Sequence, residues 1–67
     1  MLTRLPASHL KPGDVLHETL DAGTPDERWR RHIVLASRSL GDSYWRLVFA
    51  SGQSRDYDND HLVEVEV

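Results

Sequence analysis

Apolar and polar residues alternate along most of this chain, and the alternation predicts a protein built from β-strands. The strongest alternation lies in residues Tyr44–Ala50, where Trp45, Leu47 and Phe49 share one face. Successive side chains of a strand point to opposite faces, so a period of two indicates a strand with one buried face. We therefore expect these three side chains in the core and the residues between them on the outer face.

Four further segments show the strand pattern, and glycine- or proline-containing stretches separate them. These expected strands are Val15–Leu20, Trp29–Ser37, Ser54–Tyr57 and Leu62–Val67. A Pro-Gly pair precedes the first of them, in the sequence KPGD at 11–14. This pair fits a type II turn, because glycine accepts the positive φ required at the third position.

The two ends of the chain give different signals. In the last strand we expect Val63, Val65 and Val67 to point inward and the glutamates between them to face water. Residues 1–10 lack a regular apolar spacing, and Pro6 disfavours helical geometry in the residue before it. We expect this segment to be irregular, with at most a single helical turn.

Five short strands in 67 residues predict a single small all-β domain over residues 1–67. We expect a five-stranded SH3-like barrel or a strongly curled antiparallel sheet, because closure removes exposed strand edges. A chain of this length buries only ~60% of the surface that its unfolded form exposes. It contains no cysteine, so neither a disulfide nor a thiolate-bound zinc stabilises it.

The order LKPGDVL, a strand, YWRLVFASGQSRDY and DNDHLVEVEV resembles the SH3-like small barrels. In that group the third and fourth strands form a hairpin, and a tight helical turn links strands four and five. The chain also resembles in style short proteins of actinobacteria and their bacteriophages, many of which have a G-D-V turn and a V-x-V end. The aromatic set of peptide-binding SH3 domains and the KOW motif are not found, so the resemblance implies a fold and no ligand class.

The acidic run DYDND resembles the start of a calcium loop, with Asp56, Asp58 and Asp60 at alternate positions. A calcium-binding loop also needs glycine at position six and a bidentate acid at position twelve. Counted from the first aspartate, those positions are His61 and Val67. We therefore interpret the run as a turn between the last two strands, with no metal.

A catalytic site is not expected either. His17, Glu18 and Asp21 almost complete the zinc motif H-E-x-x-H, but the second histidine is missing and the segment has a strand pattern. No G-x-S-x-G nucleophile motif is present, and a domain of this size has little interior for a substrate. We expect no enzyme activity and no cofactor. No apolar stretch approaches the ~20 residues that span a bilayer, so we expect a cytoplasmic protein without membrane contact.

Arginine and aromatic side chains form the best candidate for a binding surface. Its residues are Trp29, Arg30, Arg31, Tyr44 and Arg46. These residue types are enriched in binding hot spots, because they combine large contact area with directional polar groups. Residues 28–38 contain four arginines and no acid, although the net charge of the chain is −3. We interpret the chain as a non-catalytic module that binds another protein, as a bacterial or bacteriophage accessory protein would.

Three other interpretations stay open. The arginines could pair internally with Asp26, Glu27, Glu64 and Glu66, in cross-strand ion pairs of modest strength. They could instead bind phosphates while an aromatic ring stacks on a base, as in a weak nucleic-acid binder. Finally, the strand Leu62–Val67 could leave a free edge that pairs with a second copy, as in a homodimeric structural subunit.

Overall fold

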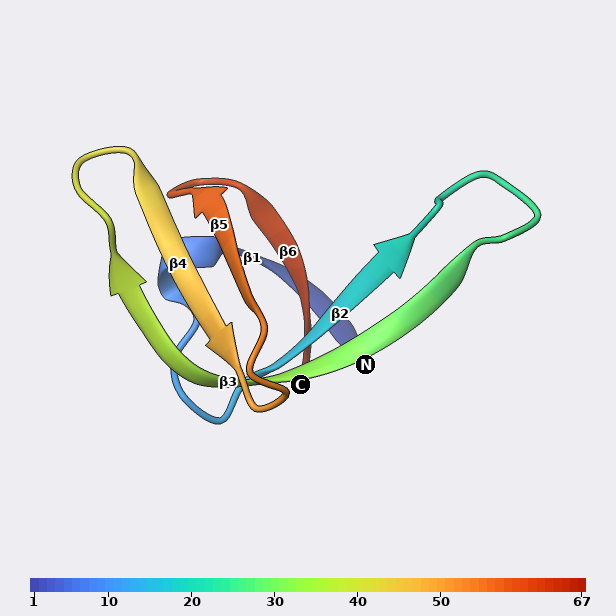
Figure 1. Cartoon of the computed structure of the whole chain (residues 1–67), viewed down its shortest axis with the longest axis horizontal. Coiled ribbons are helices and arrows are strands. Elements are labelled where there is room, and N and C mark those ends of the chain that lie inside the picture. Colours follow the sequence, from blue (N-terminus) through green and yellow to red (C-terminus); the bar gives the residue numbers. More distant parts are fainter.

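The computed structural model describes residues 1–67, which form one six-stranded antiparallel sheet. Along the chain, its elements are β1 (Leu2–Pro6), η1 (Ala7–His9), β2 (Val15–Leu20), β3 (Arg28–Ser39), β4 (Tyr44–Phe49), β5 (Ser54–Asp58) and β6 (Leu62–Glu66). In space the strands follow the order β1-β6-β2-β3-β4-β5 (Figure 1). The expected all-β class is confirmed. Only a single 3-10 turn is helical, and no helix has the length and hydropathy to cross a membrane.

The expected closure of the sheet is wrong. The sheet is open, with β1 and β5 as its two edges, so it is neither a closed barrel nor a strongly curled sheet. The prediction used five strands and left out Leu2–Pro6, which pairs along the whole of β6. Because this strand covers β6, the C-terminal strand is shielded without closure. Pro6 fits there, since an edge strand tolerates a residue without an N–H donor.

The N-terminal segment differs from expectation in part. Residues 2–6, expected to be irregular, form β1, whereas the 3-10 turn that follows at Ala7–His9 agrees with the expectation of at most a single helical turn. The resemblance to SH3-like barrels implied such a turn between the last two strands, but a plain turn at Asn59 and Asp60 occupies that place. The interpretation of the DYDND run as that turn is confirmed for Asn59 and Asp60, whereas residues 56–58 belong to β5.

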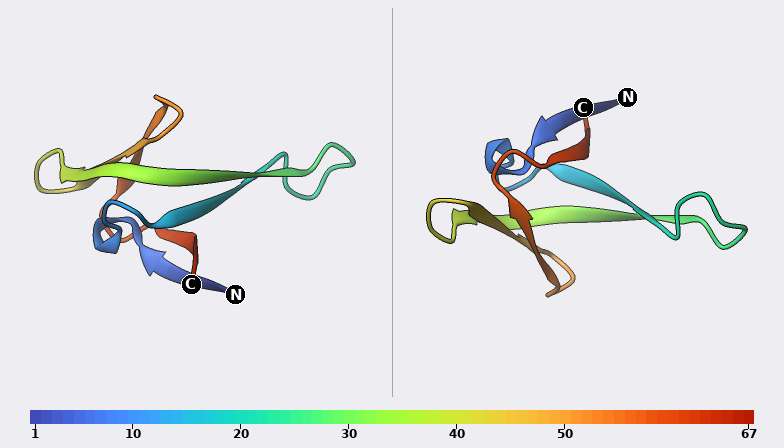
Figure 2. Two further views of the ribbon diagram at one scale, coloured as in Figure 1. Left: turned by 90° about the horizontal axis from the view of Figure 1, so that it is seen from below. Right: turned by 90° about the horizontal axis from the view of Figure 1, so that it is seen from above.

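Strand β3 is the longest element and changes its partner halfway along. Its residues 28–33 pair with β2, whereas its residues 34–39 pair with β4. The change occurs beside an irregularity in the ladder between Val34 and Ala36. Figure 2 shows β3 running through the molecule, with β4 and β5 at one end and the β2–β3 hairpin extending from the other.

The core lies where β3 changes partner. Its seven buried residues are Leu10, Leu16, Val34, Leu47, Phe49, Val63 and Val65. The predicted inward faces of β4 and β6 are therefore confirmed for four residues, and Trp45 packs against the same cluster while half-buried. The expectation for Val67 is wrong, because it lies beyond the end of β6 and is exposed.

The turn before β2 has the conformation that its sequence predicts. Gly13 has a φ of 96°, and the Asp14 N–H donates to the Lys11 carbonyl over 3.1 Å. The Asp14 carboxylate in turn accepts from the Lys11 N–H over 3.0 Å. This turn directs β2 into the sheet, so that Leu16 reaches the core.

Candidate interaction surface

Strands β2 and β3 extend beyond the rest of the sheet as a two-stranded hairpin, which we call the hairpin arm and define as residues 18–31. Strand β6 pairs with β2 only over Val15–His17, and β4 pairs with β3 only from Val34 onward. No third strand therefore flanks the arm, and every residue from Asp21 to Arg31 is exposed. Figure 1 shows the arm reaching away from the body of the molecule.

The tip of the arm is closed by two successive turns. The Thr24 N–H donates to the Asp21 carbonyl over 3.2 Å, and the Glu27 N–H donates to the Thr24 carbonyl over 3.1 Å. The Thr24 hydroxyl adds a 2.7 Å bond to the same Asp21 carbonyl. These local bonds give the loop an internal structure, although nothing packs against it.

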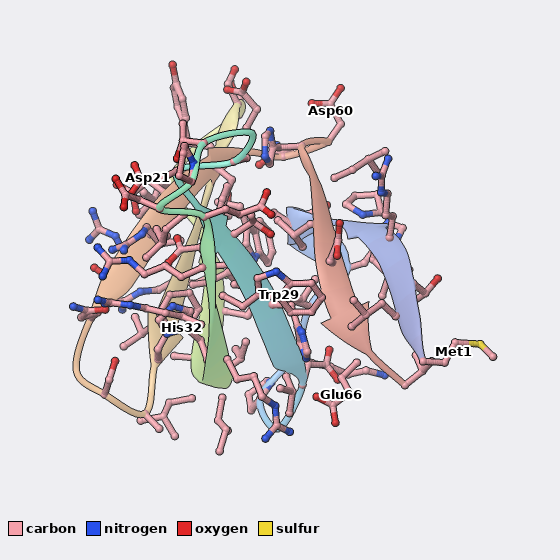
Figure 3. The ribbon with its side chains drawn as sticks, turned by 90° about the vertical axis from the view of Figure 1, so that its right-hand side faces the viewer. Met1, Asp21, Trp29, His32, Asp60 and Glu66 are labelled. Carbon is pink, nitrogen blue, oxygen red and sulfur yellow. The ribbon has the colours of Figure 1, made fainter.

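The two faces of the arm carry different chemistry because side chains alternate along β3. Trp29 and Arg31 lie on one face, together with Ile33, whereas Arg30 lies on the opposite face, together with His32. In Figure 3, which looks at the arm from its tip, Trp29 lies on the side of Glu66 and His32 on the other side. The predicted binding residues of β3 are thus divided between two faces.

On the face of Trp29, an ion-paired cluster surrounds Glu66. Arg31 donates to both carboxylate oxygens, over 3.0 and 3.1 Å, and His17 Nε2 lies 2.8 Å from Oε2. These hydrogen bonds, chiefly the one to His17, lower the pKa of the Glu66 carboxyl. Trp29, 61% exposed, meets the His17 ring edge-on with centroids 5.8 Å apart. Part of the internal pairing left open by the sequence is thus present, and Trp29 remains accessible beside it.

Tyr44 and Arg46 do not belong to the same surface. Both face outward, as the alternation predicts, but they lie on β4 beside the far end of β3, roughly 30 Å along the strand from Trp29 at the usual rise per residue. Arg46 donates to both oxygens of Asp56, over 2.8 and 3.0 Å, and this pairing lowers the pKa of the aspartate. The five predicted residues therefore form two separate groups.

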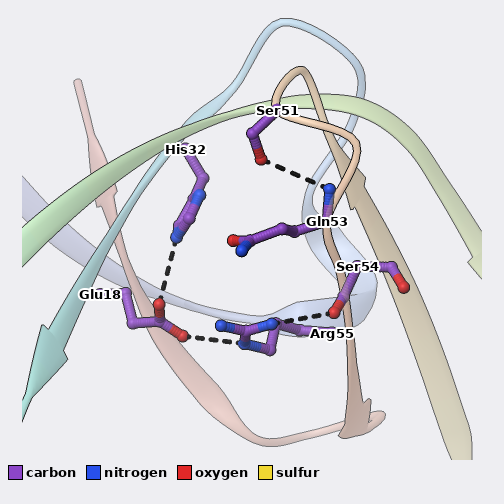
Figure 4. Close-up of polar contacts among 6 residues, drawn as sticks. All are labelled: Glu18, His32, Ser51, Gln53, Ser54 and Arg55. Atoms are coloured by element: carbon purple, nitrogen blue, oxygen red, sulfur yellow. Dashed lines mark hydrogen bonds and ion pairs between the residues drawn. The ribbon is translucent and has the colours of Figure 1, made fainter.

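A second cluster, which the sequence reasoning missed, surrounds Glu18 on the opposite face of the sheet (Figure 4). Glu18 Oε1 lies 3.1 Å from His32 Nε2, and Arg55 Nε donates to Oε2 over 3.1 Å. His32 is only 5% exposed and stacks on Phe49 with ring centroids 4.2 Å apart. The signal was available, because the alternation of β3 places His32 on the same face as Val34, where a buried imidazole needs a polar partner.

The Glu18 cluster has an architectural role. Arg55 belongs to the edge strand β5, which is hydrogen-bonded only to β4, and its bond to Glu18 connects that edge to β2. Burial of the Glu18 carboxyl raises its pKa, but the hydrogen bonds from His32 and Arg55 outweigh this effect and the net pKa is lowered. The ionised carboxylate is therefore the form that this arrangement stabilises.

A groove of about 250 Å³ opens where β2 and β6 diverge. Tyr57 and His61, stacked with centroids 5.3 Å apart, line it together with Leu62 and the polar side chains Glu18 and Glu64. Burial, and the nearby Glu18 charge, raise the pKa of the Tyr57 hydroxyl. Glu18 in this groove is already engaged by His32 and Arg55.

The motifs rejected from the sequence lie apart in the structure. Asp56 pairs with Arg46, whereas Asp60 lies in the turn after β5. His17 lies in β2 and Asp21 in the tip of the arm. No group of three or more histidine or acidic side chains is arranged to hold a metal ion.

The alternative in which the C-terminal strand leaves a free edge does not hold. Strand β6 lies between β1 and β2 and is paired on both sides.

No protein-family model, no curated protein and no solved structure matches this chain.

Proposed function

We propose that this protein is a non-catalytic interaction module that binds another protein through the hairpin arm. The observation that carries the proposal is the exposed Trp29 on a ribbon that has no third strand beside it and no core beneath it. An isolated two-stranded hairpin is marginally stable in water. A partner that covers the arm would shield the Trp29 indole and the unpaired backbone groups from solvent, and so stabilise the hairpin. We further propose that the sheet is an open variant of the SH3-like small barrels, which the tight β4–β5 hairpin supports, in a cytoplasmic bacterial or bacteriophage accessory protein.

A protein partner fits the arm better than a nucleic acid. Of the three arginines at the start of β3, Arg31 is occupied by Glu66, which leaves Arg28 and Arg30 without an acidic partner. Two cations and one indole, in a chain with a net charge of −3, provide a weak electrostatic surface for phosphates. The same groups are sufficient for a protein hot spot, in which one aromatic anchor dominates the affinity.

The test is affinity capture from a bacterial lysate, with and without nuclease, using wild type and Trp29→Ala. We expect nuclease-resistant proteins that wild type enriches and the variant loses by about tenfold or more, because hot-spot truncations cost ≥ ~2 kcal/mol. Circular dichroism and urea unfolding confirm that the variant is folded.

Tyr44→Ala is the matched control. Tyr44 is exposed to a similar extent, 55%, and lies on the same sheet far from the arm. Equal loss on both substitutions would indicate non-specific adhesion of aromatic side chains and contradict the proposal. Capture that disappears with nuclease would replace the protein partner by a nucleic acid.

A further inference from the structure

The arm has an unpaired backbone edge on β3. The Ile33 carbonyl accepts from the Ala50 N–H over 2.8 Å on the β4 side, whereas Val34 exchanges hydrogen bonds with the turn before β2. Backbone groups of successive strand residues point to alternate sides, so those of Trp29 and Arg31 also point to the β4 side. Strand β4 does not extend that far, because its pairing with β3 begins at Val34. The N–H and C=O groups of Trp29 and Arg31 therefore face outward along the part of β3 that β4 leaves unpaired.

The side chains along this edge are basic on one face and aromatic on the other. Arg28 and Arg30 share the face of His32 and have no ion pair, although Arg30 lies opposite Glu18 in the ladder. Glu18 does not neutralise Arg30, because it is engaged by His32 and Arg55. A strand added here would meet two free guanidinium groups on one face and the Trp29 indole on the other.

Two copies of this chain do not fit each other through this edge of β3. Antiparallel pairing of two β3 edges brings the basic segment 28–32 against itself, and like charges directly opposite each other destabilise a strand pair. The charges therefore select a strand that carries acids where this one carries arginines.

The protein contains a strand of the required chemistry. In β6, glutamates alternate with valines, and Glu66 receives the two hydrogen bonds from Arg31. The first half of β3 thus already binds one acidic, alternating strand through a side chain on its outer face. Arg28 and Arg30, on the inner face, have no such counterpart.

We infer that the free edge of β3 at residues 28–32 binds an extended acidic segment of another protein by strand addition. The segment places acidic side chains at alternate positions opposite Arg28 and Arg30, and apolar side chains against Trp29. Backbone hydrogen bonds to Trp29 and Arg31 contribute affinity, and the charges set specificity. This inference rests on the proposed function and specifies the class of partner.

The test uses isotope-labelled full-length protein and a capped peptide in which glutamate and valine alternate. Two control peptides replace every glutamate by glutamine, or the central valine by proline, which removes a backbone donor. We expect the acidic peptide to shift the NMR signals of Trp29 and Arg31 and to slow the exchange of their amide hydrogens. Arg30→Gln should weaken this binding by up to about fivefold, the upper end of what an exposed ion pair contributes. Arg38→Gln, an unpaired arginine on the paired half of β3, should leave it unchanged.

Several outcomes would overturn the inference. If the glutamine peptide bound as tightly as the acidic peptide, or if Arg38→Gln weakened binding as much as Arg30→Gln, the charges of Arg28 and Arg30 would not select the partner. Protection at Asp56 and Asp58, whose backbone groups face away from β4, would place the added strand on the β5 edge instead. Protection of Trp29 that grows with protein concentration, without peptide, would indicate a second copy. Tighter binding of a single-stranded oligonucleotide with the same Arg30 dependence would indicate a nucleic-acid ligand.

If no peptide bound at millimolar concentration, Arg28 and Arg30 would serve only to prevent the free edge of β3 from pairing with other chains and aggregating. If Trp29→Ala still abolished lysate capture, the proposed function would stand and the acidic strand alone would be wrong. If capture were also independent of Trp29, both would fail.

Discussion

The two halves of β3 are both strand, but they differ in how much of them is buried. Val34, at the start of the second half, is 1% exposed and belongs to the core, whereas Trp29 in the first half is largely exposed to solvent. The first half is paired on one side only, by a strand that ends in the same projecting hairpin. The comparison teaches that one strand contributes to the core near its midpoint and extends into solvent at its first residues, where we propose the binding surface.

Burial explains why the two halves should respond differently to substitution. Phe49 is fully buried where β3 meets β4, so its removal leaves a cavity in a small core. Trp29 is 61% exposed and packs against His17 in a T-shaped arrangement, so its removal creates no core cavity. Stability should therefore depend on the body, and affinity should depend on the arm.

The largest expected effect comes from Phe49→Ala. Truncation of a buried phenylalanine costs about 3–5 kcal/mol, which is comparable to the whole stability of a small domain. We expect most molecules to unfold, as measured by circular dichroism and urea titration. Trp29→Ala, measured in parallel, should lower the free energy of unfolding by less than about 0.5 kcal/mol, as exposed substitutions do. Similar losses for both substitutions would refute the division between arm and body.

A smaller decrease in the free energy of unfolding is expected from Glu18→Gln. Its side chain is 17% exposed and joins His32 in the body to Arg55 on the edge strand. Loss of these charge-assisted hydrogen bonds should cost about 1–2 kcal/mol in the free energy of unfolding, measured in urea at neutral pH. Glu66→Gln, which removes the corresponding cluster on the exposed face, is the matched control and should cost clearly less. A larger loss from Glu66→Gln would show that the outer cluster, and not the inner one, holds the sheet together.

The smallest expected effect is a pH dependence of the difference in free energy of unfolding between wild type and Glu18→Gln. The folded-state pKa of Glu18 lies below its ordinary value of 4.5, so the unfolded chain takes up the proton first as the pH falls. The stabilisation is therefore complete above that ordinary value and is lost as the pH falls through the lowered pKa. The difference in free energy of unfolding between wild type and Glu18→Gln should shrink as the pH falls below the ordinary carboxyl value of 4.5. A difference that stays constant or grows on acidification would contradict the bonding assigned to this carboxylate.

Features that depend on interactions between residues close in sequence were predicted correctly, whereas features that depend on pairing between distant segments were not. The strand Val15–Leu20 was predicted with its observed bounds, and the faces of β4 followed from alternation alone. These features depend on local periodicity and on the Pro-Gly turn, which a short window contains. Leu2–Pro6 was missed because its strand character comes from pairing with β6, about sixty residues later.

The expected grouping of the five binding residues is wrong for the same reason. Trp29, Arg30 and Arg31 were identified by type, and the arm does present them. Tyr44 and Arg46 were grouped with them by composition, but the change of partner in β3 places them at the far end of the sheet. No local pattern encodes where β4 begins to pair, so the sequence could not separate the two groups.

By itself, the sequence determined the all-β class, the inward faces of β4 and β6 and the turn before β2, because period-two burial and backbone preferences act over a few residues. Only the tertiary structure decided which edges stay open, that Glu18 joins His32 to Arg55, and that residues 18–31 extend alone as an arm. These features depend on the lengths over which distant strands pair, and strand pairing is set by the packing of the whole core.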